Sequence, residues 1–267
     1  MFGKFKKNKT YIIAEIGGNF VNFDQAKLII DHAKKCGVDA IKLQTYEADT
    51  ITSKKANFDM ENVGYVSQYN TFKKYQIDYD LHKLIFNYID QLKLDWFSTP
   101  SHKKDVDMLE TLNVIAHKIG SDDAVNFPFL KYVAKTKKPI ILSTGMCTLD
   151  EVSQAVDTIL STGNEKLILL HAITSYPTHS DNVNLKAIQT LKREFPEIPV
   201  GYSDHTLSPI ASLCSVAMGA NVIERHFTHD KKADGPDHQL SSDPKEMKWL
   251  VDSIRSFEKM RGTGVKK

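Results

Sequence analysis

Short apolar runs and longer amphipathic segments alternate along almost the whole chain. Eight runs are rich in β-branched, aliphatic and aromatic residues, which favours strands. After each run, apolar residues recur three or four positions apart, which predicts a helix with one buried face. This alternation indicates parallel strand pairing. The predicted strands are Tyr11–Ile16, Ala40–Leu43, Leu94–Phe97, Ala116–Ile119, Pro139–Leu142, Leu167–Leu170, Val200–Tyr202 and Asn221–Ile223. The predicted helices are Phe23–Cys36, Leu81–Leu92, Lys104–Leu112, Phe129–Thr136, Leu149–Leu160, Leu185–Phe195, Ile210–Met218 and Lys245–Met260.

Polar or ionisable residues stand at the end of nearly every predicted strand. Closure of parallel strands into a barrel would gather these residues at one rim, where barrel enzymes carry their active sites. An open doubly wound sheet shares the alternation, but the strand number and the polar strand ends favour the barrel. The chain also contains no Gly-x-Gly-x-x-Gly fingerprint and no Walker loop. We therefore predict an α/β enzyme with a TIM (β/α)8 barrel. The strand-end residues are Glu15, Lys42, Gln44, Ser98, Thr99, Lys118, Ser121, Ser143, Tyr176, Ser203, Asp204, His205, Glu224 and His226.

The length of the chain suits a single domain. Its 267 residues match a barrel of about 250 residues. We expect a basic N-terminal tail over residues 1–10, the barrel over residues 11–262 and a short C-terminal tail over residues 263–267. An insertion at about residues 46–75 separates the second strand from its helix and is far longer than a usual connection. Its place on the catalytic rim favours a lid or substrate wall over a plain surface excursion.

Composition and charge exclude several classes of function. A net charge of +2 argues against nucleic acid as the main partner, and 41% hydrophobic residues are enough for a full core. No apolar run approaches the roughly 20 residues of a membrane span, and the N-terminus lacks the apolar segment of a signal peptide. The three cysteines have no paired spacing, which is typical of a reduced protein. We expect a cytoplasmic enzyme that acts on small molecules.

Two histidines on consecutive predicted strands are the leading candidates for a metal site. His205 and His226 each come directly after an apolar stretch, so both side chains are expected above the barrel. Two neutral imidazoles there could hold a divalent transition metal and leave coordination positions open for water and substrate. The alternative is a pair of separately hydrogen-bonded histidines with no ligand.

Two lysines within apolar strands indicate an anion site. Lys42 and Lys118 would be costly to bury without a carboxylate or an anionic ligand. A single buried lysine usually forms a structural ion pair, but two on the same rim favour ligand binding. Together with nearby hydroxyl groups they would form a cradle for phosphate and carboxylate groups. The hydroxyl groups belong to Ser98, Thr99, Ser121, Ser143 and Ser203.

Acidic side chains on the same rim have two interpretations. Glu15, Glu224 and Asp204 could be ion-pair partners of the lysines, or Glu15 could move a proton at a reacting carbonyl. Asp237 follows Gly235 and Pro236 in the loop after the last strand. It could belong to a simple turn or accept a hydrogen bond from a sugar hydroxyl. The residues alone leave both choices open.

Seven short motifs, in order along the chain, resemble those of the sialic acid synthase family. The family includes N-acetylneuraminate, legionaminate and pseudaminate synthases and spore-coat polysaccharide synthases, which condense phosphoenolpyruvate with an amino sugar. The resemblance runs from about Tyr11 to Lys267. Each motif is weak by itself, but seven in the family's order are highly specific. The motifs are Ala14-Glu15-Ile16-Gly17, Lys42-Leu43-Gln44-Thr45, Ser98-Thr99-Pro100, Lys118-Ile119-Gly120-Ser121, Leu142-Ser143-Thr144-Gly145-Met146, Ser203-Asp204-His205-Thr206 and Glu224-Arg225-His226-Phe227-Thr228.

The resemblance implies roles for the candidate residues. It implies a TIM barrel whose two histidines, His205 and His226, bind a divalent metal, most often manganese, with magnesium or cobalt as alternatives. It implies that phosphate leaves with cleavage of a C–O bond and that a 2-keto-3-deoxy nonulosonic acid is formed, with Glu15 and Glu224 near the reacting centre. Phosphoenolpyruvate would lie among Lys42, Thr99, Lys118, Ser121, Ser143 and Ser203, and the amino sugar would lie near Gln44, Tyr176 and Asp237.

The chain departs from the family pattern in two places. Family members carry a C-terminal antifreeze-like domain that supplies an arginine to the active site of the partner subunit in a homodimer, and this sequence stops where the linker to it would begin. A separate antifreeze-like protein would then be a partner, or the arginine is dispensable or replaced by Arg225 or Arg261. Thr174 stands where a sialic acid synthase commonly has asparagine, which leaves N-acetylmannosamine and related deoxy-diacetamido hexoses both open. The competing functions are a metal-dependent sugar aldolase or isomerase, and a barrel subunit inactive without its partner.

Overall fold

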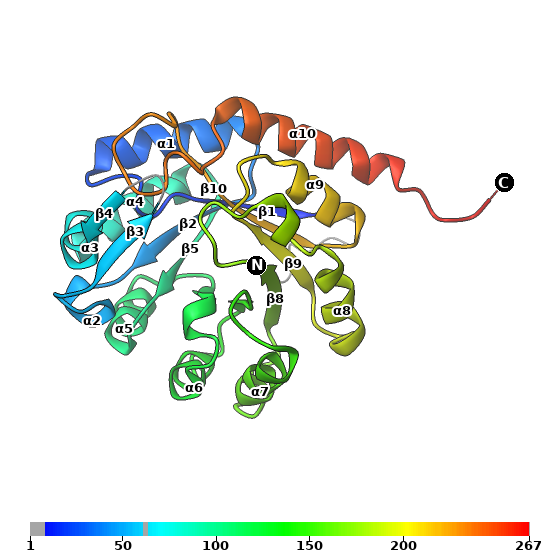
Figure 1. Ribbon diagram of the computed structural model, residues 1–267, viewed down its shortest axis with the longest axis horizontal. Helices are drawn as coiled ribbons and strands as arrows, with labels where there is room; N and C mark the ends of the chain where they lie inside the picture. The colour runs from blue at the N-terminus through cyan, green and yellow to red at the C-terminus, as the bar shows by residue number, and fades with distance from the viewer. Residues whose placement is uncertain (1–8, 61–63, 267) are drawn as a thin grey trace.

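Eight parallel strands close into a barrel, as the sequence predicts (Figure 1). The computed structural model describes residues 9–60 and 64–266. Around the barrel the strand order is β1, β10, β9, β8, β7, β6, β5 and β2, and pairing of β2 with β1 completes the closure. The strands are β1 (Tyr11–Glu15), β2 (Ala40–Thr45), β5 (Asp95–Pro100), β6 (His117–Ile119), β7 (Ile140–Ser143), β8 (Leu167–Ala172), β9 (Val200–Asp204) and β10 (Val222–His226).

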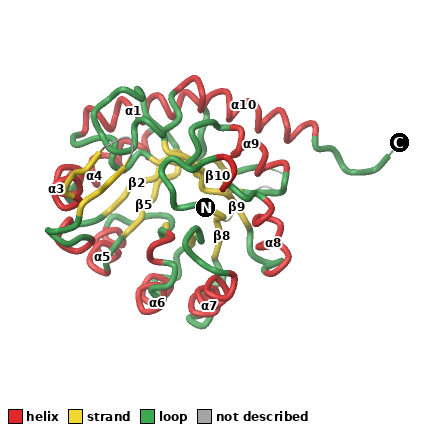
Figure 2. Tube along the Cα trace, viewed as in Figure 1, coloured by secondary structure: helices red, strands yellow, loops and turns green. Residues whose placement is uncertain are grey.

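One amphipathic helix follows each barrel strand and covers the outside of the barrel (Figure 2). Local signals fix several helix ends: Gly37 ends α1 in the left-handed conformation that glycine adopts without strain, and Thr148 forms a capping box with Glu151 at the start of α7. The predicted helices are confirmed. They are α1 (Phe23–Cys36), α4 (Tyr79–Gln91), α5 (Lys103–Thr111), α6 (Phe127–Ala134), α7 (Leu149–Leu160), α8 (Lys186–Glu194), α9 (Ile210–Ala217) and α10 (Pro244–Met260).

Alternation along the strands separates two apolar layers. Residues that face the helices, such as Ile12 and Ile223, form the large outer core, whereas a smaller cluster fills the interior of the barrel. The interior is therefore packed, and a ligand has access only above this cluster. The interior cluster consists of Tyr11, Ile13, Ala40, Phe97, Ala116, Ile141, Ile168, Leu170 and Val222.

Strand register sets the next interior layer, which is polar. Glu15 pairs in register with Lys42 on one side and with His226 on the other, and Glu224 pairs with Ser203. Because side chains alternate between the two faces of a strand, inward positions two residues beyond the apolar cluster carry the ionisable groups. The strand-end residues thus meet at the carboxyl end of the barrel.

The insertion between β2 and α4 folds into a short helix, a hairpin and a second helix. These are α2 (Ala48–Ile51), strands β3 (Asn57–Met60) and β4 (Gly64–Ser67), and α3 (Gln68–Tyr75). Two contacts join α3 to the loop between β10 and α10: Lys74 forms an ion pair with Asp234 at 2.6 Å, and the Tyr75 hydroxyl donates to the Asp234 carbonyl at 3.2 Å. The insertion therefore reaches past β1 to the loop that follows β10.

The two predicted tails flank the barrel. Most of the basic N-terminal tail, residues 1–8, lies outside the described residues. After α10 the chain leaves the barrel, and residues 263–266 are exposed and form no helix or strand (Figure 1). None of the helices in the described ranges is both long and apolar enough to cross a lipid bilayer.

Candidate active site

A cavity of about 710 Å³ opens at the carboxyl ends of the barrel strands. It is large enough for two small molecules side by side, because pockets for drug-sized ligands begin at about 300 Å³. Most of the candidate residues contribute to its lining, but three do not. Glu15 forms an ion pair with Lys42 at 2.5 Å, the Ser98 hydroxyl bonds to the Thr45 hydroxyl at 2.6 Å, and Asp204 pairs with Arg225 at 2.7 Å and not with a lysine. The candidates in the lining are Lys42, Gln44, Thr99, Lys118, Ser121, Ser143, Tyr176, Ser203, His205, Glu224, His226 and Asp237.

Lys42, Lys118 and Glu224 form the floor of the cavity, Glu15 packs against Lys42, and all four are buried. The Lys42 ammonium lies 2.5 Å from the Glu15 carboxylate and 3.6 Å from Glu224, and it also donates to the Thr99 hydroxyl at 3.0 Å. The Lys118 ammonium also lies 3.6 Å from Glu224, but among the described residues it donates a hydrogen bond only to the Ile119 carbonyl, at 3.2 Å. Lys42 is therefore well paired, and Lys118 is paired only loosely.

The pKa shifts of these groups follow from that difference. Burial by itself would lower the pKa of Lys42, but the carboxylates of Glu15 and Glu224 raise it. For Lys118, burial outweighs the attraction of Glu224, and the pKa falls. Burial also raises the pKa of Glu15, while both ammonium groups hold the pKa of Glu224 below its usual value. An anionic ligand would stabilise the charged form of Lys118.

Hydroxyl groups beside the lysines are available to donate hydrogen bonds. The Ser143 hydroxyl is buried in the cavity wall and has no hydrogen-bond partner among the described residues. The Ser121 hydroxyl accepts a hydrogen bond from the Gly145 amide at 2.9 Å, and the Thr99 hydroxyl accepts one from Lys42, so both retain their own O–H group. A buried polar group without a partner is costly, which indicates a ligand oxygen in this place.

The two candidate histidines meet across the cavity from the lysines. The ring centroids of His205 and His226 lie 5.7 Å apart, and the Tyr176 ring packs against His205 with its centroid at 4.1 Å. Burial lowers the pKa of both imidazoles, and in His226 the proximity of His205 lowers it further. Both rings are therefore neutral near pH 7 and present lone pairs.

The surroundings of the histidines fit a metal ligand pair. Nδ1 of His205 bonds to the Ile173 carbonyl at 2.8 Å, which leaves Nε2 as the free lone pair, and metal-bound histidines are usually held in this way. Nδ1 of His226 lies 3.5 Å from the Asp237 carboxylate. Within residues 9–60 and 64–266, no three His, Cys, Asp or Glu side chains form a group that could hold a metal ion by themselves, so a metal on the two imidazoles would take its other ligands from water or substrate.

The carboxyl group of Asp237, on the same side of the cavity as the histidines, has a raised pKa. Burial, together with repulsion from Glu15, raises its pKa to about 7 despite the attraction of Lys42. A nearby cation or a hydrogen-bond donor on a ligand would stabilise its ionised form. Asp237 and Tyr176 contact His226 and His205 and thus belong to the part of the cavity with the histidines, and Gln44 lines the cavity from β2.

The insertion supplies cavity residues that motif reasoning did not identify. Ile51, Phe58 and Phe72 give the wall an apolar face, and Tyr46 and Tyr75 stand at its two ends. The only signal in the sequence was the place of the insertion after β2. The polar members of this wall are Thr50, Gln68 and Thr71.

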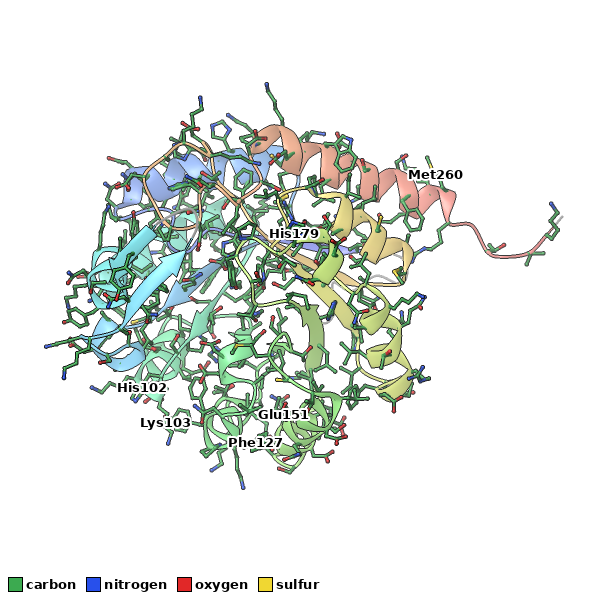
Figure 3. The ribbon with its side chains drawn as sticks, viewed as in Figure 1. His102, Lys103, Phe127, Glu151, His179 and Met260 are labelled. Atoms are coloured by element: carbon green, nitrogen blue, oxygen red, sulfur yellow. The ribbon has the colours of Figure 1, made fainter. Side chains whose placement is uncertain are left out.

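Two arginines that could have replaced a missing one lie away from the cavity. The suggestion that Arg225 or Arg261 replaces a missing arginine is wrong for this structure: Arg225 is buried behind the barrel wall against Asp204, and Arg261 follows α10 at an exposed position. Neither contributes to the lining. Figure 3 shows two further histidines: His179 lies in the loop after β8 with its side chain 83% exposed, whereas His102 lies at the start of α5 and lines the cavity.

Comparisons with known proteins identify the family. The family model described as the NeuB family matches residues 29–266. The chain belongs to the NeuB family. Its resemblance to sialic acid synthases, inferred from the seven motifs, is therefore confirmed, and so is the prediction of an enzyme, since characterised members of this family are synthases.

Individual relatives of this NeuB-family chain cover nearly all of its length. It is 46% identical to an uncharacterized protein of Methanocaldococcus jannaschii over 98% of the chain and 74% of that protein. It is 43% identical to an N,N'-diacetyllegionaminic acid synthase of Legionella pneumophila over 96% of the chain and 74% of the relative. The crystal structure of an N-acetylneuraminic acid synthetase from Leptospira borgpetersenii, in complex with citrate, superposes with a TM-score of 0.86 at 31% identity, covering 97% of this chain and 87% of the other.

Proposed function

We propose that this protein condenses phosphoenolpyruvate with the open-chain form of an N-acetylated amino sugar, giving a sialic-acid-like 2-keto-3-deoxy nonulosonic acid and phosphate. The observation that carries the proposal is the arrangement of one cavity. A loosely paired ammonium with free hydroxyl groups lies on one side, and two neutral imidazoles lie on the other. A small dianion or trianion and a carbonyl compound are the ligands that these two halves favour.

Phosphoenolpyruvate would occupy the half of the cavity with the lysines. Lys118 and the Ser143, Ser121 and Thr99 hydroxyls would bind its phosphate and carboxylate oxygens, and Lys42 would add charge from below. Holding both anionic groups fixes the direction in which C3 of the enol points. Such orientation lowers the barrier by removing the entropy cost of bringing two reactants together.

The amino sugar would occupy the half with the histidines and the insertion. Tyr176, Gln44 and Asp237 would contact its chain, with the aldehyde near His205 and His226. A divalent cation held by these two imidazoles, manganese being our first choice, would polarise the aldehyde. The neutral state of both rings, and the Nδ1 contact of His205 with the Ile173 carbonyl, support this assignment.

The atoms of the reaction balance with one water molecule. A C–C bond forms between C3 of phosphoenolpyruvate and the aldehyde carbon, water adds at C2, and phosphate leaves with the oxygen that joined it to C2. Glu224 faces the cavity with one buried carboxylate oxygen unpartnered among the described residues, so it is placed to hold the attacking water. Glu15, 2.5 Å from the Lys42 ammonium and with a raised pKa, would exchange protons through Lys42.

The sugar substituents follow from the named relatives and from the cavity wall. The relatives include N,N'-diacetyllegionaminic acid synthases, at 43% and 40% identity, and a pseudaminic acid synthase at 36%. With Thr174 in the cavity wall in place of asparagine, and apolar residues on the insertion, we favour a deoxy-diacetamido hexose over N-acetylmannosamine. The resemblance further implies a cytoplasmic homodimer, with a separate antifreeze-like protein as a possible partner.

Phosphate release tests the proposed function directly. The purified protein is incubated with phosphoenolpyruvate, a candidate hexosamine and manganese, and then with each component omitted in turn. We expect phosphate only when all three are present, together with a product whose mass equals the sum of both substrates and water minus phosphoric acid. Phosphoenolpyruvate labelled with 18O at C2 should deliver the label to phosphate. Turnover of a phosphosugar without phosphoenolpyruvate would instead support the aldolase or isomerase.

A further inference from the structure

Tyr46 stands in the cavity wall, and its hydroxyl group has no hydrogen-bond partner among the described residues. It follows β2 directly, its side chain is buried, and it lines the cavity. No hydrogen bond joins its hydroxyl to any residue within the described ranges. The other three buried tyrosines all bond: Tyr11 to Asp95, Tyr75 to the Asp234 carbonyl and Tyr202 to Asp204. Tyr46 is thus the exception among the buried tyrosines of the described chain.

The insertion holds the Tyr46 ring in place. The Phe72 ring contacts it edge-on with centroids 5.3 Å apart, and Phe58 contacts Phe72 in the same way at 5.5 Å. Both phenylalanines also line the cavity, as does Ile51. A ring packed in this way presents its hydroxyl in a fixed direction, so a hydrogen bond to a ligand would cost little side-chain entropy.

The charge around Tyr46 makes it a hydrogen-bond donor. Burial raises the pKa of its phenol, and the carboxylates of Asp237 and Glu15 raise it further, so the hydroxyl keeps its proton at any physiological pH. Its neighbours Asp237 and Gln44 belong to the half of the cavity assigned to the sugar. A polar oxygen of the sugar is therefore the acceptor that Tyr46 meets.

We propose that Tyr46 is a specificity-determining residue that donates a hydrogen bond to the carbonyl oxygen of an acetamido group on the sugar, while Phe58, Phe72 and Ile51 pack against the acetamido methyl. The inference rests on the proposed function and adds to it the recognition of one substituent. An acetamido group combines a hydrogen-bond acceptor with an adjoining methyl, which matches a fixed donor beside an apolar wall. A hydroxyl substituent would leave the apolar part of this wall in contact with water.

The test compares Tyr46→Phe with Tyr75→Phe. Both changes remove one hydroxyl and keep the ring, and both residues line the cavity, but Tyr75 already donates to the Asp234 carbonyl. Phosphate release is measured at saturating phosphoenolpyruvate, with N-acetylmannosamine and with mannose. We expect Tyr46→Phe to lower kcat/KM for the acetylated sugar by about tenfold, the usual effect of one lost hydrogen bond to a substrate, and to leave mannose unchanged. The KM for phosphoenolpyruvate should stay constant, and Tyr75→Phe should affect both sugars equally.

Two outcomes separate this inference from the proposed function. If the wild-type protein turns over both substrates and Tyr46→Phe changes the two sugars by the same factor, the role of Tyr46 is overturned and the proposed function stands. If the wild-type protein releases no phosphate with any sugar, the proposed function fails. Binding of N-acetylmannosamine is then followed by saturation-transfer NMR at the acetamido methyl. A signal that weakens in Tyr46→Phe but not in Tyr75→Phe supports the inference, and equal signals overturn it.

Discussion

Lys42 and Lys118 carry the same charge in the same wall but have different partners. Lys42 contacts two carboxylates and a hydroxyl, so its removal would leave Glu15 and Glu224 buried without compensation and destabilise the fold. Among the described residues Lys118 contacts one carboxylate, Glu224 at 3.6 Å, and one carbonyl, that of Ile119 at 3.2 Å, so its charge is available to a ligand. Replacement of Lys118 is therefore the cleaner test of anion binding.

We predict that Lys118→Ala raises the KM for phosphoenolpyruvate by roughly 30-fold, about 2 kcal/mol, because one charge-assisted hydrogen bond to the substrate is lost. The KM for the sugar should change little. Steady-state phosphate release measures both constants, and Lys131→Ala, at an exposed position on α6, is the control. An unchanged KM for phosphoenolpyruvate would remove Lys118 from the anion site.

Asp237 should make stability depend on pH in the metal-free protein. Its pKa is about 7 in the folded chain and about 3.8 when unfolded, so the unfolded state ionises first as the pH rises. The folded state therefore loses stability between pH 4 and pH 7, and the loss is complete above pH 7. Urea unfolding of wild type and Asp237→Asn should give similar free energies at pH 4. At pH 8 the variant should be more stable by roughly 4 kcal/mol, because each unit of pKa difference corresponds to about 1.4 kcal/mol. If the difference in unfolding free energy between the two proteins is the same at pH 4 and at pH 8, the pKa of this carboxyl group is not raised in the folded state.

At the scale of elements, a buried ion pair joins the two strands that carry the histidines. Arg225 on β10 contacts the Asp204 carboxylate on β9 at 2.7 Å and donates to the Thr206 carbonyl at 2.7 Å and to the Ser242 hydroxyl at 2.5 Å. Asp204 and Thr206 flank His205 in the chain. The guanidinium thus fixes the backbone on which both imidazoles depend, and Arg225 acts as a positioning residue.

We predict that Arg225→Lys weakens manganese binding by about 10- to 100-fold, as changes around metal ligands usually do. Arg255→Lys is a matched control, because Arg255 also makes three contacts, to Asp39, Glu258 and the Thr10 carbonyl, near the amino ends of β1 and β2. Both variants should lose unfolding free energy. Calorimetric titration with manganese should show weaker binding only for Arg225→Lys, and equal affinities in the two variants would refute the positioning role.

Removal of the β3–β4 hairpin should change the binding of the sugar more than the stability of the barrel. Replacement of residues 57–67 by a short Gly-Ser linker removes Phe58 from the cavity wall but no residue of the barrel core. We predict a KM for the acetamido sugar raised by at least tenfold, with the KM for phosphoenolpyruvate and the unfolding midpoint nearly unchanged. A loss of stability with unchanged sugar kinetics would leave the insertion with a structural role only.

Regular elements could be predicted from the sequence because their signals are local. The strands and helices of the barrel follow the periods of 2 and 3.6, and their bounds lie close to those observed. Alternation also accounts for the error with Arg225: Glu224 and His226 face inward, so the residue between them must face the helices. Tyr46 could not be identified in this way, because its place in the wall depends on how the insertion folds back over the rim.

At the scale of the whole molecule, the barrel keeps the residues that pack the core apart from the polar residues that line the cavity. The apolar interior cluster and the outer core lie below and around the polar layer, so the rim residues can hold unpaired hydroxyls and loosely paired charges at a cost that the rest of the fold offsets. Groups of this kind lower the stability of the ligand-free protein and gain their partners when substrates bind.

Ligand binding should therefore stabilise the barrel as one unit. Phosphoenolpyruvate at 100 times its Kd adds about 2.7 kcal/mol to the folded state, which for a chain of this size raises Tm by roughly 5–10 °C. Scanning calorimetry should show one transition that moves upward with phosphoenolpyruvate concentration, because the cavity floor belongs to strands from all around the barrel. Lys118→Ala should need a much higher concentration for the same shift, whereas Lys131→Ala should behave as wild type. A transition that splits, or one that phosphoenolpyruvate leaves unmoved in the wild-type protein, would contradict the assignment of the anion site to this floor.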